Sequence, residues 1–212
     1  MQFSPTTTSY ALLGLLNLRS WSTYELAKQV KRSLHWFWPR AERKLYQEPK
    51  LLVAAGLATA SMEATGNRPR TVYTITDAGR AALAAWLSEP PEPRSAEFAA
   101  MVKVFFADAG SLDQLEGTLD AIEAEAWERI DELALMSGQL VEGARFPERL
   151  QLGAVSLRLQ LEQDLAVVRW VAWAREQVSA WNGTTDPGSW DPKASLTELL
   201  ADVETMRART PV

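Results

Sequence analysis

Residues 57–75 read LATASMEATGNRPRTVYTI, and this stretch decides the fold class. Polar and apolar residues alternate in part over 57–64 and again over 71–75, as they do in strands with one buried face. Between the two runs lies Thr65-Gly-Asn-Arg-Pro-Arg70, a cluster of turn-forming residues that contains two arginines. The pattern predicts a β-hairpin with a basic tip.

Two helices are predicted before this hairpin. Apolar residues over 8–18 indicate a short buried helix. Ser22, with Glu25 three residues later, forms a capping box, because each side chain can bond the backbone N–H of the other residue. A second helix is therefore expected from this box to about Ser33.

A third helix is predicted from Pro39 to about Ala55, since proline suits a first turn and Gly56 suits the position after a helix end. After the hairpin, Thr76 caps a fourth helix over about 77–88. Three helices, a hairpin and a helix in this order are typical of a winged helix-turn-helix. The expected fold class is mainly α with a small β-hairpin.

The chain is interrupted at Pro90-Pro91-Glu92-Pro93, because three prolines in four residues cannot lie inside a helix. We place a domain boundary there. Residues 1–89 are expected to form the winged helix-turn-helix domain, residues 90–94 a proline-rich linker, and residues 95–212 a helical domain for dimerisation and ligand binding.

The helical domain is predicted to contain a helix over 95–108, a long amphipathic helix from Leu112 to about Leu140, a second long helix from Pro147, and a terminal helix over 195–209. The second long helix carries two apolar stripes, and a partner subunit is the simplest cover for them. The residues expected at the dimer interface are Leu150, Leu157, Leu161, Leu165 and Val168.

Composition excludes several classes of protein. The chain has 212 residues, no cysteine and a single histidine, His35, so disulfide scaffolds, thiolate metal sites and His-rich metal sites are excluded. No nucleophile–base pair, phosphate-binding loop or dinucleotide motif is visible, so we expect neither an enzyme nor a cofactor. No apolar run reaches the roughly 18 residues of a membrane span. A cytoplasmic location is expected.

Charge is divided unevenly along the chain. Residues 1–86 carry a net charge of +6, whereas residues 87–212 carry a net charge of -11. A basic N-terminal part favours a polyanionic partner, and an acidic C-terminal part favours protein or small-molecule partners.

Two basic clusters fall where a winged helix contacts DNA. One is on the third helix, whose N-terminal part faces base edges in a helix-turn-helix, and the other is at the hairpin tip. The residues predicted to bind double-stranded DNA are Arg40, Arg43, Lys44, Tyr46, Lys50, Asn67, Arg68 and Arg70.

Longer motifs carry a resemblance to a known family. In order, the chain contains Tyr10-Ala-Leu-Leu-Gly-Leu-Leu, Tyr24-Glu-Leu, Phe37-Trp-Pro, Leu45-Tyr46 with Gly56-Leu57, and Arg68-Pro-Arg-Thr-Val-Tyr-Thr-Ile-Thr-Asp-Ala-Gly-Arg80. This series resembles the PadR family of bacterial transcriptional regulators over residues 8–88. The resemblance implies a homodimeric repressor, of the larger type with a long helical C-terminal domain, whose ligand is small and often aromatic.

One residue departs from the family pattern. Where the family has a leucine, this chain has Pro49 within Tyr46-Gln-Glu-Pro49. A proline inside a helix removes an N–H donor and clashes with the carbonyl four residues earlier, so a kink is expected near Leu45.

Nine tryptophans suggest an aromatic ligand site in the helical domain, and the candidates are Trp127, Trp170 and Trp173. Packing between helices is the alternative role for each of them. For the whole chain the main hypothesis is a ligand-released DNA-binding repressor. The rival hypothesis is a winged-helix module that binds protein rather than DNA, with the acidic part as its working surface.

Overall fold

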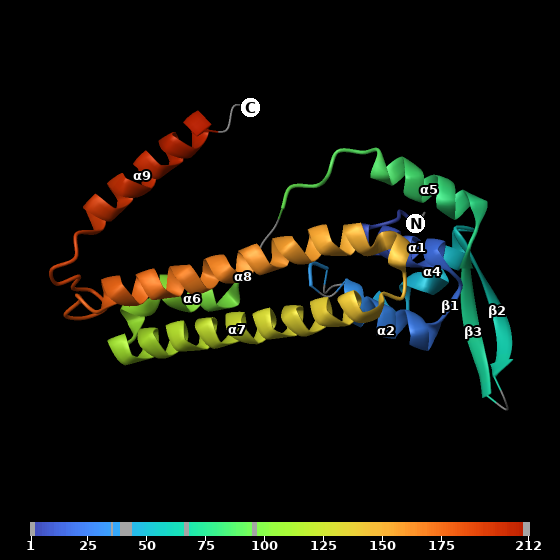
Figure 1. Cartoon of the computed structure of the whole chain (residues 1–212), viewed down its shortest axis with the longest axis horizontal. Helices are drawn as coiled ribbons and strands as arrows, with labels where there is room; N and C mark the ends of the chain where they lie inside the picture. The colour runs from blue at the N-terminus through green and yellow to red at the C-terminus, as the bar shows by residue number, and fades with distance from the viewer. Residues whose placement is uncertain (1–2, 35, 39–43, 66–67, 95–96, 210–212) are drawn as a thin grey trace. The chain divides into compact units, whose positions relative to one another are not determined.

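The computed structural model describes residues 3–34, 36–38, 44–65, 68–94 and 97–209. They divide into two compact units, Met1–Arg94 and Ser95–Val212. Figure 1 shows the helices and strands of both units. The prediction of a mainly helical chain with a small β element is confirmed.

The first unit begins with α1 (Thr7–Leu18) and α2 (Thr23–Ser33), joined by the two-residue strand β1 (Trp21–Ser22). The capping box predicted for α2 is present, since Ser22 Oγ accepts from the Glu25 N–H and Glu25 Oε2 accepts from the Ser22 N–H at 2.9 Å. The strand β1 was not predicted, because two residues show no alternation.

The hairpin is formed by β2 (Ala58–Thr65) and β3 (Arg68–Ile75), which pair antiparallel from Ala58↔Ile75 to Thr65↔Arg68. β1 pairs with the other side of β3, so the sheet has the order β1-β3-β2. β2 has the predicted length, shifted by one residue, whereas β3 is longer than predicted. Residues 68–70 belong to β3 and not to the connecting turn.

The apolar side chains of α1, α2, α4 (Glu48–Ala54) and β3 form the core of this unit. Trp21 is fully buried and donates from its indole Nε1 to the Leu15 carbonyl at 2.6 Å. Trp86 on α5 (Asp77–Leu87) stacks on Tyr10 of α1, with ring centroids 4.8 Å apart. The first unit therefore has a hydrophobic core of its own.

Gly79 lies in the first turn of α5, against the base of the hairpin. A Cβ added there would lie 2.1 Å from the Leu57 carbonyl oxygen. The same base is joined by Thr76, whose Oγ1 donates to the Gly56 carbonyl at 2.7 Å and accepts from the Gly79 N–H at 3.0 Å. Gly56 itself has φ +74°, as expected for a glycine after a helix end.

Gly79→Ala is expected to lower the free energy of unfolding by about 2 kcal/mol, because a backbone oxygen must move to admit the new methyl group. Chemical denaturation of the full chain measures this. Gly14→Ala in α1 is the control, since no atom lies within 4 Å of its added Cβ, and it is expected to be neutral or stabilising by up to about 1 kcal/mol. Equal stability of the two variants would contradict the close approach.

The α2 cap makes stability depend on acid pH. Hydrogen bonds from the side chain and backbone of Ser22, aided by Arg19, lower the pKa of Glu25 to about 2. Because the folded-state pKa lies below the unfolded value, this contribution to stability is complete above about pH 5 and is lost as the pH falls towards 2. Ser22→Ala is expected to cost about 1 kcal/mol at pH 7 and less at pH 2, as measured by urea unfolding at both pH values. An equal cost at both pH values would contradict this linkage.

The second unit is helical over the residues that the structure describes. It contains α6 (Ala99–Phe105), the 3-10 turns η1 (Ala107–Ala109) and η2 (Pro147–Arg149), and the helices α7 (Leu112–Gly143), α8 (Leu150–Val178) and α9 (Pro192–Arg209). α7 and α8 run antiparallel as a hairpin (Figure 1). Its core contains Leu115, Leu119, Ile122, Val171, Ala174 and Val178.

The start predicted for the last helix was wrong. α9 begins at Pro192, three residues before the predicted start at residue 195. Asp191 Oδ1 accepts from the N–H groups of Lys193 and Ala194 at 2.9 and 3.2 Å. Asp191 therefore caps the helix. No described residue of α9 is buried.

Candidate nucleic-acid interface

The predicted third helix is not continuous, which corrects the expected kink. Lys44 is helical, residues 45–47 form a turn, and α4 then begins at Glu48. Pro49 lies in the first turn of α4, where its missing N–H would have no helical partner in any case. The penalty of about 3 kcal/mol for an interior proline therefore does not apply, and Pro49→Leu is not expected to stabilise the fold by that amount.

Buried polar groups fix the position of this turn and the start of α4. Glu48 is only 3% exposed, and its Oε1 accepts a hydrogen bond from Ser9 Oγ of α1. Ser9 Oγ accepts in turn from the Thr6 N–H at 2.7 Å. Leu45 and Pro49, near Glu48 in the sequence, are buried as well. The start of α4 is therefore joined to the start of α1 through one hydroxyl group.

The predicted DNA-binding residues before and within α4 point into solvent where the structure describes them. Lys44 and Lys50 are exposed, and Tyr46 is 69% exposed. Arg40 and Arg43 lie outside the described residues, so their predicted contacts with base edges stay predictions.

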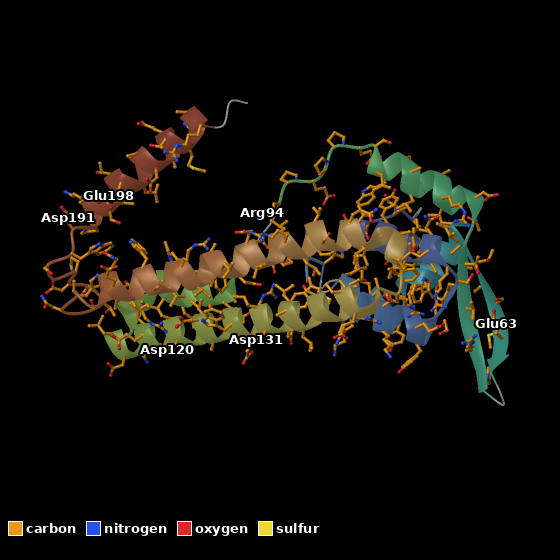
Figure 2. All side chains as sticks on the ribbon, viewed as in Figure 1. Glu63, Arg94, Asp120, Asp131, Asp191 and Glu198 are labelled. Atoms are coloured by element: carbon orange, nitrogen blue, oxygen red, sulfur yellow. The ribbon has the colours of Figure 1, made fainter. Side chains whose placement is uncertain are left out.

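The wing places its basic residues differently from the prediction. Arg70 lies within β3 and not at the hairpin tip, directly opposite Glu63 of β2 (labelled in Figure 2). Arg70 Nη2 lies 3.1 Å from Glu63 Oε2, so this arginine has a carboxylate partner in the free protein. Asn67 lies outside the described residues, as does the side chain of Arg68.

The structure reveals one basic surface that the sequence reasoning missed. Lys28, Lys31 and Arg32 are exposed on α2. Their spacing on one helical face, opposite the buried Leu26 and Val30, was visible in the sequence.

In the second unit the three candidate tryptophans do not form a cage. Trp170 packs against the α7–α8 core, whereas Trp127 and Trp173 are 47% and 46% exposed. No ring contact joins any two of them. A groove of about 750 Å³ lies elsewhere in this unit, between α6, η1 and α7. Small side chains line much of it, including Ala99, Ala100, Gly117 and Ala121, with Lys103 and Phe106 beside them.

The predicted interface residues of α8 differ in exposure. Leu150 is 42% exposed, and Leu157, Leu161, Leu165 and Val168 are half-buried. The second apolar stripe is more exposed, because Leu152, Val155 and Leu159 lie 52–74% open. Both stripes leave apolar surface uncovered in a single chain.

The described residues contain neither a metal-binding cluster nor a membrane-spanning helix. No group of three His, Asp or Glu side chains there could hold a metal ion. None of the described helices combines the length and the apolar character that a membrane crossing requires.

Residues 12–85 match the model of the transcriptional regulator PadR-like family. The N-terminal unit is therefore similar to this family. The PadR-like match covers the second half of α1, all of α2, α4 and the hairpin, and nearly all of α5, which are the elements that build the winged helix.

Two curated relatives are similar to part of the chain. A probable transcriptional regulator of Mycobacterium tuberculosis is 34% identical over 85 residues, which are 40% of this chain and 45% of that protein. The negative transcriptional regulator PadR of Bacillus subtilis is 32% identical over 99 residues, which are 46% of this chain and 54% of PadR. The chain thus spans about half the length of the curated relatives it matches. Both relatives are named as regulators, which supports the prediction that the chain is not an enzyme.

Solved structures extend the likeness of fold to both units. B. subtilis PadR in complex with operator DNA has a TM-score of 0.70 at 23% identity, covering 82% of this chain and 99% of that one. The same protein in complex with p-coumaric acid has a TM-score of 0.67 with the same coverage. The PadR fold therefore includes the helical second unit.

Proposed function

We propose that this chain is a homodimeric, sequence-specific DNA-binding regulator of transcription, acting as a repressor that a small aromatic ligand releases. The observation that carries the proposal is the PadR-like winged helix, whose described cations before and within α4 point into solvent. B. subtilis PadR, with the same fold, has been solved on operator DNA. The mechanism is steric, since two winged helices occupy neighbouring major grooves about 34 Å apart over a promoter.

Dimerisation supplies the second winged helix. Leu152, Val155 and Leu159 leave an apolar row open on α8, and Leu150 adds to it. Exposed rows of this kind mark contact surfaces, and a stable dimer interface buries about 1,600 Å² in total. The half-buried Leu157, Leu161, Leu165 and Val168 would complete the interface with the partner subunit.

Binding of a small ligand is the proposed cause of release from DNA. B. subtilis PadR was solved with p-coumaric acid, a flat aromatic acid. A similar ligand bound beside Trp127, Trp170 or Trp173 would favour a dimer whose two wings no longer match the groove spacing. The regulator acts in the cytoplasm, where its DNA is.

DNA binding is expected to depend steeply on salt. Four phosphate contacts per subunit give eight per dimer, so the slope of log K against log salt concentration is expected to be about -7 or steeper. Fluorescence anisotropy with a duplex selected by the protein from random DNA measures this slope between 50 and 300 mM salt.

The same measurement separates the rival function. The acidic second part of the chain, with a net charge of -11 over residues 87–212, favours a protein-binding module. A module of that kind would bind no duplex at low salt, and a slope near zero would overturn the proposed function.

A further inference from the structure

α9 carries an apolar row that the described residues of its own chain leave uncovered. Five large apolar side chains fall within an arc of about 120° at 3.6 residues per turn. We call them the α9 row. They are 41–63% exposed and comprise Leu196, Leu199, Leu200, Val203 and Met206. Most of the stability of a helix in a protein comes from packing of such a row, so α9 lacks its main stabilising contact in the single chain.

The loop before α9 fixes the start of the helix. Trp190 stacks on Trp181, which follows the end of α8, with ring centroids 5.6 Å apart. Thr184 Oγ1 donates to the Gly110 carbonyl at 3.2 Å, which ties the loop to the segment before α7. These contacts set the direction in which α9 leaves the α7–α8 hairpin. In that direction none of the described residues of α9 is buried by its own chain.

The groove between α6, η1 and α7 fits a helix of this kind. Its lining is mainly apolar, with Lys103 and Glu125 adding one charge of each sign, as in the centre of a protein interface. From Ser111 to Glu125 the groove follows α7 for about 21 Å, at 1.5 Å per residue. The α9 row, from Leu196 to Met206, spans about 15 Å by the same measure and is therefore short enough to lie within the groove.

α9 is also of a size that the PadR fold does not account for. The match to B. subtilis PadR uses 99% of that chain but covers 82% of this one, so this chain has an additional portion. Residues 179–212, which contain α9 and its loop, are a portion of about that size, 34 residues of 212.

We propose that the groove between α6, η1 and α7 binds the α9 row of a second copy of this chain, so that two subunits exchange their α9 helices. Reciprocal exchange forms two equal contacts and closes on two copies. α9 has three basic and three acidic residues, whereas residues 87–212 carry a net charge of -11. A neutral helix can therefore approach the acidic unit of a second copy with little repulsion.

The exchange is a contact separate from the exposed row of α8. That row ends at Leu159, and α8 continues for 19 residues, or about 28 Å, to Val178 before the loop that leads to α9. The inference does not depend on DNA binding.

The absence of cysteine from the chain allows a test by site-specific cross-linking. One full-length chain carries Ala121→Cys in the groove, and a co-expressed chain with a longer affinity tag carries Leu200→Cys in the α9 row. A short bismaleimide is expected to join them into a covalent heterodimer on a denaturing gel. Ala201→Cys, on the opposite side of α9, replaces Leu200→Cys in the matched control and should give at least tenfold less product.

Gly117→Leu tests the groove itself. Gly117 lines the groove, and no atom lies within 4 Å of a Cβ added there, so the single chain admits the larger residue. The new side chain would occupy the place of the α9 row, so the cross-linked yield should fall at least tenfold. Hydrogen exchange should become at least tenfold faster in α9 and stay unchanged in α7. Gly138→Leu, in α7 outside the groove and equally open, is the control and should change neither.

The results that would overturn the exchange are specific. A cross-link that forms only when Ala121→Cys and Leu200→Cys are in the same chain would show that α9 binds its own groove. A yield no higher than that of the Ala201→Cys control, or a Gly117→Leu variant with unchanged cross-linking and unchanged exchange in α9, would show that the groove does not bind α9. The proposed function would stand in each case, because it is tested by the salt dependence of DNA binding.

Discussion

A fragment of residues 1–94 is expected to be monomeric and to bind the selected duplex about a thousandfold more weakly than the full chain. The fragment keeps its own core, with Trp21, Leu26 and Leu52 fully buried, so it should fold. It loses α7 and α8, and with α8 the exposed apolar row that is proposed to join two subunits. Two linked half-sites bind by effective concentration, and a single winged helix lacks this gain.

Sedimentation velocity and anisotropy measure the two parts of this expectation separately. The full chain is the reference, at micromolar concentration in the same buffer. A dimeric fragment, or a monomeric full chain, would show that the second unit does not join the subunits. A monomeric fragment that binds as tightly as the full chain would show that pairing does not contribute to affinity.

Arg129→Ala is expected to lower the free energy of unfolding of the second unit by about 3 kcal/mol. Arg129 of α7 donates from Nε to Asp164 Oδ1 of α8 at 2.9 Å. The Asp164 side chain is only 9% exposed, and its Oδ2 is buried without a hydrogen-bond partner in the structure. Removing the guanidinium leaves a carboxylate in the α7–α8 interface with no opposite charge.

Arg158→Ala is the matched control. Arg158 pairs with Glu162 one turn away on α8, and both side chains are open to solvent. Exposed pairs of this kind contribute less than about 1 kcal/mol. The double variant Arg129→Met with Asp164→Leu should recover most of the lost stability, because replacing both ions removes the unpaired charge. Urea unfolding compares the three, and equal losses at Arg129 and Arg158 would contradict the buried-pair argument.

The local signals in the sequence predicted the first unit well. The capping box of α2, the cap at Thr76 and the glycine after α4 were each read from neighbouring residues, and each is present in the structure. These helix-end residues provide hydrogen bonds or backbone conformations within one turn of the helix end. Their residues are therefore close together in the sequence as well as in space.

The predictions that were wrong concern features set by contacts between residues far apart in the sequence. The break before α4 places Glu48 in the core, where it meets Ser9, 39 residues earlier in the chain. The hairpin turn seemed longer than it is, because Pro69 and Arg70 are typical of turns, although pairing with Ala64 and Glu63 holds them in β3. Which cations remain open on α2 follows from which carboxylates lie nearby in the fold. None of these facts can be read from spacing along a single helix.

The hairpin is fixed at its base, so a small rotation there produces a large displacement at its far end. Gly79 and Thr76 fix the backbone at residues 56 and 57, while the paired strands extend from there over eight residues each. At about 3.3 Å per residue the wing reaches roughly 26 Å, so a tilt of about 10° at its base moves its tip by some 4–5 Å. A hydrogen bond to a phosphate spans only about 3 Å. Loosening these two contacts is therefore enough to move the far end of the wing by more than the length of a hydrogen bond, without any change to the strands themselves.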